Sequence, residues 1–186
     1  MNSDNRAHNG SVLCLDLNSD NTLLASGSLD STVNIINVHN CKVLLTIKAG
    51  GGGARQSNKS EELKTDEEDG NDSIESVTFS GKNLLALATV NGVLETWDVS
   101  SQTKRNELKL DFGICKISTD SNNPNLLYCG CLDSVFRVVD WRNCEVVLSR
   151  AGHTDQILDY AVSSDSNYVL TCSEDATCKI FALKNN

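Results

Sequence analysis

The sequence predicts an all-β fold built from four copies of one antiparallel unit. The first observation is an internal repeat, because similar segments end on the anchor residues Asp30, Asn91, Asp133 and Asp175, which are 61, 42 and 42 residues apart. The second observation is that each copy alternates short apolar runs with turn residues, as strands joined by hairpins do. Four such units and one insertion near the start account for all 186 residues.

The elements of the first unit follow from the alternation of its side chains. Strands are predicted at 11–17, 22–28, 32–38 and 42–47. In the first strand, Val12, Cys14 and Asp16 alternate with leucines, which is the period of two that a strand requires. A tight turn is predicted at every anchor, and Asn91-Gly92 is the strongest signal because both residues tolerate positive φ. The four units are predicted at 8–48, 73–110, 111–150 and 151–183.

Residues 49–72 interrupt the repeat between the first two units. Gly50–Gly53 is a flexible run, and residues 55–72 hold seven acidic and three basic residues, with one leucine and no aromatic residue. Because such a segment buries almost nothing, we expect a disordered, solvated loop. A second hypothesis is a docking or phosphorylation segment, since acidic residues directly follow the hydroxyl of Thr65.

The charge balance narrows the class of partner. The chain has 16 basic and 25 acidic residues and a formal net charge of -9. We therefore expect no direct binding to nucleic acid, which needs a basic surface, whereas a basic protein partner is compatible. The sequence has no apolar run of the roughly 20 residues that span a bilayer and no signal peptide, so we expect a cytoplasmic protein with reduced thiols and no membrane insertion.

Short motifs in these units resemble WD repeats, the units of β-propellers. Gly152-His153 and Ala7-His8 stand at the Gly-His position, and Trp97-Asp98 stands at the Trp-Asp position. In the first and fourth units the histidine precedes a hydroxyl residue by 18 positions and the anchor by 22. The resemblance implies a structural hydrogen-bonded chain within each sheet, formed here by His8, Ser26, Asp30, Trp97, His153, Thr171 and Asp175.

The middle units depart from this pattern. The second and third units lack the histidine, and Leu87 and Cys129 stand at the hydroxyl position. The tryptophan position holds Ile36, Trp97, Val139 and Phe181. We therefore expect the second and third sheets to depend on apolar packing rather than on the polar chain.

The resemblance also implies an incomplete ring. Propellers close with four to eight blades, each a four-stranded sheet. The four units here predict a single incomplete propeller domain over residues 1–186, an open arc of about three four-stranded blades and one three-stranded blade. We expect the remaining blades to be missing from this chain.

No residue pattern indicates catalysis. The sequence lacks a nucleophile elbow, a phosphate-binding loop and a zinc-protease motif, so we expect neither an enzyme nor a cofactor. Cys129 and Cys131 are the best metal candidates, since zinc accepts thiolates. They match Ser26 and Ser28 of the first unit, however. These two positions of the repeat therefore require small side chains, and we expect no metal site.

The functional prediction is a scaffold that binds a protein or peptide. Residues 74–98 and the last unit resemble the C-terminal half of the angio-associated migratory cell protein family, which implies a link to cell migration and vessel formation. Relatives of that family suggest an alternative, a dedicated chaperone for a basic ribosomal protein in large-subunit assembly. The resemblance places partner contacts at Ser11, Leu13, Leu29, Ser73, Glu75, Val90, Ile114, Lys116, Leu132, Gln156, Leu158 and Glu174. Leu29, Val90 and Leu132 share one equivalent place and, if exposed together, suit a protein partner.

Overall fold

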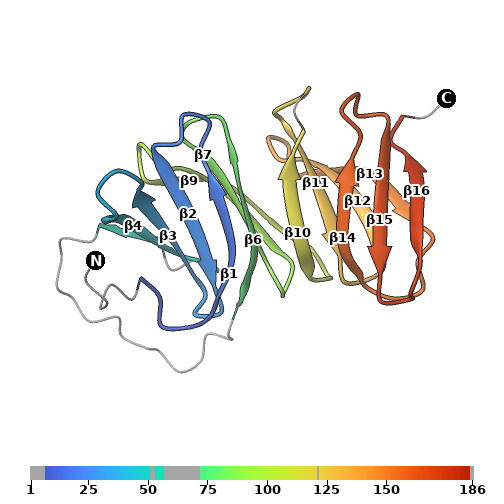
Figure 1. Ribbon diagram of the computed structural model, residues 1–186, viewed down its shortest axis with the longest axis horizontal. Coiled ribbons are helices and arrows are strands. Elements are labelled where there is room, and N and C mark those ends of the chain that lie inside the picture. The colour runs from blue at the N-terminus through green and yellow to red at the C-terminus, as the bar shows by residue number, and fades with distance from the viewer. Residues whose placement is uncertain (1–6, 51–52, 57–71, 121, 185–186) are drawn as a thin grey trace.

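The computed structural model describes residues 7–50, 53–56, 72–120 and 122–184. Within these ranges the chain forms sixteen strands, and no helix is found among them, so none could cross a membrane. The strands form four separate antiparallel sheets and no closed barrel, as Figure 1 shows. The predicted all-β fold class, a partial propeller, is confirmed.

Each sheet is a meander in which consecutive strands pair. The first sheet contains β1 (Val12–Leu17), β2 (Leu23–Ser28), β3 (Thr32–Asn37), β4 (Val43–Lys48) and β5 (Gly53–Gln56). The second contains β6 (Ile74–Ser80), β7 (Leu84–Thr89), β8 (Val93–Asp98) and β9 (Thr103–Lys109). The third contains β10 (Ile114–Thr119), β11 (Leu126–Cys131), β12 (Val135–Asp140) and β13 (Glu145–Ala151), and the fourth contains β14 (Ile157–Val162), β15 (Tyr168–Ser173) and β16 (Cys178–Ala182).

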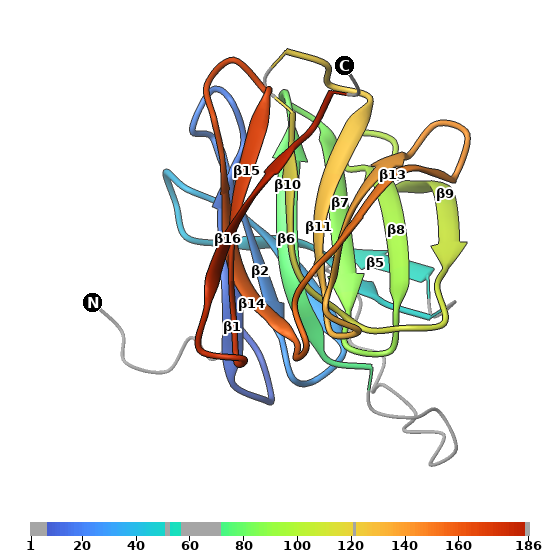
Figure 2. The same ribbon diagram turned by 90° about the vertical axis from the view of Figure 1, so that its right-hand side faces the viewer.

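The sheets stand side by side in chain order. The first strand of each sheet contacts the first strand of the next, β1 with β6, β6 with β10, and β10 with β14. The later strands of each sheet extend away from this row, as the two views in Figures 1 and 2 show. The four first strands therefore form one continuous inner surface.

Apolar side chains fill the space between neighbouring sheets. Ile35 and Ile47 of the first sheet pack with Leu85 and Trp97 of the second, and all four are nearly inaccessible to solvent. Phe136 of the third sheet lies edge-on against Tyr160 of the fourth, with ring centroids 5.1 Å apart. Since hydrophobic burial is the main favourable contribution to folding, each sheet is stabilised by its neighbours.

The anchor turns share one backbone conformation. The residue after each anchor has positive φ, and these residues are Ser31, Gly92, Ser134 and Ala176. Of the pair Asn91-Gly92, positive φ occurs only at the glycine. A carbon at the Cβ position of Gly92 would lie 2.3 Å from the carbonyl oxygen of Phe112, so this turn of the second sheet has no room for a side chain.

The insertion corrects one prediction. Composition predicts disorder at residues 53–56, but they form β5 and make the first sheet five-stranded. Ala54 pairs with Ile47 and Gly53 pairs with Lys48, so the backbone of β4 supplies the partners. Backbone pairing on an open strand edge needs no apolar side chain, which is why composition missed it. The hypothesis on Thr65 falls outside the described residues.

Candidate functional site

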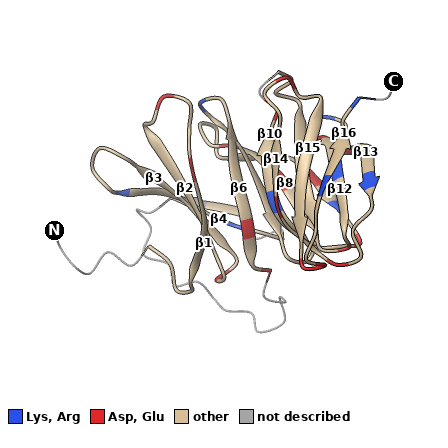
Figure 3. Ribbon diagram, turned by 45° about the vertical axis from the view of Figure 1, so that its right-hand side comes forward, with Lys and Arg blue, Asp and Glu red and all other residues tan. Residues whose placement is uncertain are grey.

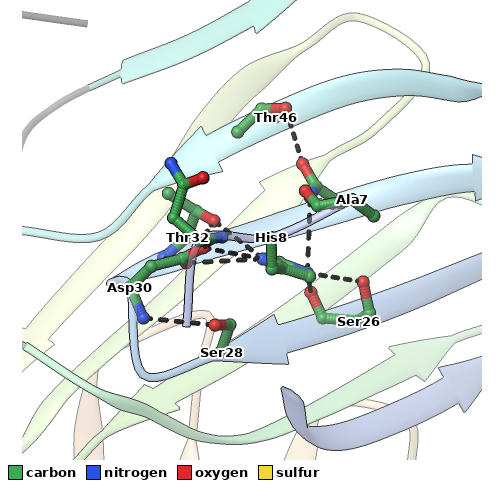
Figure 4. A network of polar contacts seen from close by, with 9 residues as sticks. Ala7, His8, Ser26, Ser28, Asp30, Thr32 and Thr46 are labelled. Carbon is green, nitrogen blue, oxygen red and sulfur yellow. Dashed lines mark hydrogen bonds and ion pairs between the residues drawn. The ribbon is translucent and has the colours of Figure 1, made fainter. Parts of the chain in front are cut away.

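A hydrogen-bonded chain joins three segments of the first sheet. His8 precedes β1, Ser26 lies on β2, and Asp30 lies in the following turn (Figure 4). The Nε2 atom of His8 is 2.8 Å from the Ser26 hydroxyl, and its Nδ1 atom is 3.2 Å from an Asp30 carboxylate oxygen. Because a carboxylate only accepts, Nδ1 of His8 is the donor in the bond to Asp30.

Asp30 accepts two further hydrogen bonds that the sequence did not lead us to expect. The Thr32 hydroxyl donates to its carboxylate at 2.6 Å, and the backbone N–H of Asn9 donates at 2.7 Å. Partial burial alone would raise the pKa of Asp30, but these hydrogen bonds and the nearby His8 lower it below the ordinary value. A hydroxyl two residues after an aspartate is the usual sign of such a turn, and it was available in the sequence.

The fourth sheet repeats this arrangement. His153 Nε2 is 2.7 Å from the Thr171 hydroxyl, and Nδ1 is 2.8 Å from Asp175. The Thr177 hydroxyl donates to Asp175 at 2.6 Å, as Thr32 does to Asp30. The hydrogen bond from Thr177 is the main cause that lowers the pKa of Asp175, and His153 adds to it. In both sheets, therefore, Nε2 of the histidine contacts the hydroxyl on the second strand and Nδ1 contacts the anchor aspartate.

The second sheet contains a different buried polar chain, which corrects the expectation of apolar packing alone. Trp97 is not joined to a histidine. Its indole N–H donates to the carboxylate of Glu95 at 2.7 Å, and the Glu95 side chain is fully buried. The Lys104 ammonium lies 3.4 Å from the other oxygen of Glu95, and the Gly50 backbone N–H donates to that oxygen at 3.2 Å. This carboxylate therefore joins β8, β9 and the segment after β4.

The third sheet uses an arginine. The Arg137 guanidinium forms a two-bond ion pair with Asp133 at 2.5 and 2.6 Å. The Cζ atom of the Arg137 guanidinium lies 3.5 Å from the centroid of the Phe112 ring, which is a cation–π contact. The anchor aspartate of this sheet, which has no histidine, is thus paired with an arginine.

One position on the third strand of each sheet is polar in all four. It lies two residues before the tryptophan position and holds Asn34, Glu95, Arg137 and Lys179. Asn34 accepts a hydrogen bond from Thr46 at 2.6 Å and lies 3.3 Å from His8, so it belongs to the same network. We missed this position because the four residues differ in charge and size, and only their shared place identifies them.

We call the edge that carries the anchor turns and the starts of β1, β6, β10 and β14 the rim. One backbone hydrogen bond recurs there in every sheet. The N–H before each anchor donates to a carbonyl just before the first strand, from Leu29 to Ser11, from Val90 to Ser73, from Leu132 to Gly113 and from Glu174 to Gln156. A β-bulge follows on each first strand. The predicted contact residues of the first, second and fourth sheets are thereby brought together on the rim, where Ser73 is buried.

The predicted positions in the third sheet are displaced by one residue. The loop before β11 has six residues, 120–125, whereas the loops before β2 and β15 have five. Counting back from Asp133 therefore reaches Ile114 and Lys116, but the bulged residue equivalent to Leu13 is Cys115. Ile114 is fully buried in the core, so its prediction as a contact residue was wrong.

The rim exposes leucines at its first and last sheets. Leu13, Leu29 and Leu158 are 44%, 39% and 52% exposed. Val90 and Leu132 are half-buried, and both border Gly113, where a side chain would collide with them. The apolar set of Leu29, Val90 and Leu132 is thus not equally exposed, and the accessible apolar contacts are the three leucines.

Charged groups of both signs lie on the rim and beside it. Three of the four anchors are aspartates, whereas the fourth is Asn91, whose carbonyl accepts a hydrogen bond from Lys109. In Figure 3 acidic segments, in red, lie at the lower and at the upper ends of the sheets. Beside the rim, a groove of about 510 Å³ runs along the first strands and is lined in part by Asp16, Glu75, Lys116 and Asp159. Lys116 forms an ion pair with Asp159, which leaves the charge of this groove negative.

The two cysteines considered for metal binding lie in the core. Cys129 and Cys131 are fully buried on β11 among apolar side chains that include Leu127 and Val139. Burial raises the pKa of Cys131 to about 11 and that of Cys129 well above its ordinary value, which disfavours the thiolates that zinc requires. Over the described ranges, no group of three or more potential metal ligands occurs.

Comparison with known proteins identifies the repeats. A family model, "WD domain, G-beta repeat", matches residues 3–37 and 143–181. The chain carries WD repeats. It is homologous to angio-associated migratory cell protein, with 29% identity to the protein of Homo sapiens and 30% to that of Canis lupus familiaris, each over 95% of this chain. An uncharacterised WD repeat-containing protein of Schizosaccharomyces pombe is 23% identical over 89% of the chain.

This WD-repeat chain spans 40% of the length of the angio-associated migratory cell proteins it matches and 37% of the yeast relative. The matched repeats contain the two His–hydroxyl–Asp chains described above. WD-repeat proteins are generally non-catalytic and mediate contacts between proteins. The rim of this chain presents three of its exposed apolar side chains, Leu13, Leu29 and Leu158.

Proposed function

We propose that the protein is a non-catalytic scaffold whose rim binds a segment of a protein partner. The observation that carries this proposal is the exposure of Leu13, Leu29 and Leu158 on one edge of a rigid array of sheets. Leucines at such positions contribute nothing to the core, whereas burial against a partner would remove their apolar surface from water. The hydrogen bonds among histidine, hydroxyl and aspartate in the first and fourth sheets hold the turns of the rim in place.

The charge of the rim favours a partner with basic residues. The chain has a net charge of -9, and the groove beside the rim carries three carboxylates and one ammonium. A segment with alternating apolar and basic side chains would match both features. We place this scaffold in the cytoplasm and, following the name of its relatives, in migrating cells.

A second candidate function has support from the same charge. A chaperone dedicated to a basic ribosomal protein would need an acidic surface to neutralise its client during assembly of the large subunit. The two functions differ in the partner, not in the surface. In either case, we propose that further blades supplied outside this chain cover the outer faces of the first and fourth sheets.

Affinity capture with matched variants tests the proposal. The rim variant combines Leu29→Ser and Leu158→Ser, and the control is Val147→Ser, whose valine is 52% exposed on β13 away from the rim. We expect a partner captured by the unchanged protein and by the control to be lost at least tenfold with the rim variant, because each buried leucine contributes about 1–2 kcal/mol.

The identity of that partner separates the two functions. A ribosomal protein of the large subunit would support the chaperone, and a receptor or cytoskeletal adaptor would support the migration scaffold. Equal recovery of every partner with all three proteins would overturn the assignment of the rim.

A further inference from the structure

The β-bulges place one side chain of each first strand at an equivalent position on the inner surface. The bulged residues are Leu13 on β1, Glu75 on β6, Cys115 on β10 and Leu158 on β14. A bulge re-aims the side chain of its additional residue out of the regular alternation of the strand. Of these four residues, Glu75 alone carries a charge.

Glu75 lies on a strand whose neighbours are both present in this chain. The strand β6 contacts β1 on one side and β10 on the other, as Figure 1 shows. Further blades at the ends of the array would meet the first and fourth sheets, not the second. Glu75 is partly exposed between its two neighbours, and this exposure does not depend on further blades.

The groove of about 510 Å³ along the first strands contains three other charged side chains, and each has a partner within the protein. One carboxylate oxygen of Asp16 accepts a hydrogen bond from the backbone N–H of Leu17 at 2.9 Å, and the other accepts from that of Phe79 at 2.7 Å. Lys116 and Asp159 form an ion pair with each other. These three groups are therefore already satisfied.

The carboxylate of Glu75 has no such partner. Among the residues that the structure describes, none donates a hydrogen bond to it or forms an ion pair with it. A carboxylate that is partly withdrawn from water attracts a cation more strongly than a fully exposed one, because the effective dielectric constant around it is lower. Glu75 therefore favours a ligand that supplies a positive charge and N–H donors.

Thiols lie on both sides of this carboxylate. Cys14 on β1 and Cys115 on β10 line the same groove. Burial is the main cause that raises the pKa of Cys14 to about 11 and that of Cys115 to about 12, and the negative charge of Glu75 adds to both shifts. The thiols are therefore uncharged at neutral pH. Such walls suit the hydrocarbon stem of a long basic side chain.

We propose that Glu75 pairs with a lysine or arginine side chain of the partner segment, an inference that rests on the proposed function of the rim. The ammonium or guanidinium group supplies the donor that the carboxylate lacks, and the stem of the side chain lies along the two thiols. Leu13, which is 44% exposed at the neighbouring bulge, contacts an apolar residue of the same segment. The partner motif is thus a basic residue beside an apolar residue.

Other occupants fit this groove less well. An anion would meet the carboxylates of Asp16, Glu75 and Asp159, while the single ammonium group of Lys116 is already paired. A metal ion needs several ligands, and the described part of the chain holds no group of three or more histidine, cysteine or acidic side chains that could supply them. One organic cation on an extended chain matches the single open carboxylate.

Selection from a library of random decapeptides displayed on phage tests the proposal, with the full chain immobilised as the target. We expect the enriched peptides to carry lysine or arginine beside an apolar residue. One enriched peptide is then synthesised in two forms, with its basic residue and with glutamine in that place. Isothermal titration calorimetry measures the affinity of both forms for each protein variant.

A double-mutant cycle isolates the pairing. Glu75→Gln should weaken binding of the basic peptide about tenfold and change that of the glutamine peptide by less than about twofold. The control Glu145→Gln removes the same charge from an exposed position at the start of β13 and should change both affinities by less than about twofold. Because Glu75 is only partly buried, its glutamine variant should fold, and its melting temperature checks this.

The outcomes separate this inference from the proposed function. Equal losses of both peptides with Glu75→Gln, or enriched peptides without a basic residue, would overturn the pairing. The rim variant with Leu29→Ser and Leu158→Ser tests the rim itself. If it weakens the basic peptide and Glu75→Gln does not, the rim binds the segment and the role of Glu75 fails. If the rim variant leaves the affinity unchanged, the proposed function fails, and a library without any binding peptide contradicts both.

Discussion

At the scale of single residues, the anchor aspartates join each turn to the strands beside it. Asp30 and Asp175 each accept bonds from a histidine, from a threonine two residues later and from the backbone before the first strand. Each histidine also forms a hydrogen bond with a hydroxyl on the second strand of its sheet. Since these groups are largely buried, removing one member costs the others a hydrogen bond that water does not fully replace.

The substitution His153→Ala tests this chain. We expect it to lower the free energy of unfolding by about 2 kcal/mol, because Thr171 and Asp175 each lose the hydrogen bond to the buried histidine. The control is His39→Ala, since His39 is exposed, and it should change stability by less than about 0.5 kcal/mol. Urea unfolding followed by fluorescence measures both, and equal stabilities for the two variants would contradict the chain's role.

The lowered pKa of Asp30 predicts a dependence on pH. A carboxyl group whose pKa is lower in the folded state stabilises the fold above its unfolded pKa, about 3.9, and this contribution is lost as the pH falls through the folded value. Stability should therefore decline below about pH 4. Asp30→Asn should flatten that decline, and an unchanged slope would show that Asp30 is not involved.

The sequence predicted these residues where two units shared a spacing, and it failed where a single unit diverged. His8 and His153 repeat the same distances, so each supports the other. Glu95 had no such support, because its counterparts are asparagine, arginine and lysine. The bond from Trp97 to Glu95 depends on three-dimensional burial, which single-residue patterns do not contain.

At the scale of elements, strand positions were predictable and strand neighbours were not. Alternating side chains located β1 to β4 within one residue of their observed bounds. The strand β5 has no apolar pattern, since it adds to β4 through its backbone. The additional residue in the loop before β11 likewise shifted the contact positions in the third sheet, because a spacing counted along the chain includes every loop residue.

Hydrogen exchange tests the pairing of β5. We expect amides of β4 (Val43–Lys48) to exchange at least tenfold more slowly than those of β13 (Glu145–Ala151), because β4 has partners on both sides and β13 has one in the described chain. Mass spectrometry of pepsin fragments measures both strands in one sample. Equal exchange at the two strands would contradict the fifth strand.

At the scale of the whole molecule, four sheets present one rim with exposed leucines and, beside it, a groove of negative charge. The inner row of first strands fixes the spacing between sheets, so the rim residues keep their positions relative to one another. A rigid surface loses little conformational entropy on binding, which favours its use as a platform. The net charge of -9 adds a long-range attraction for basic partners.

This charge predicts that association depends on salt. For a basic partner, we expect the association rate to fall about tenfold between low and high ionic strength, while the dissociation rate changes less. Surface plasmon resonance at several salt concentrations measures both rates. An association rate that is independent of salt would exclude electrostatic steering by the negative charge of the chain.

We propose that the rim is the surface that binds a protein partner. Photo-crosslinking can identify this surface, with a benzoylphenylalanine placed in cells at position 29, at position 158 or at the control position 147, where Leu29, Leu158 and Val147 stand. We predict that positions 29 and 158 crosslink to the same partner and that position 147 does not. Crosslinks to that partner from position 147 alone, or from none of the three, would contradict the claim.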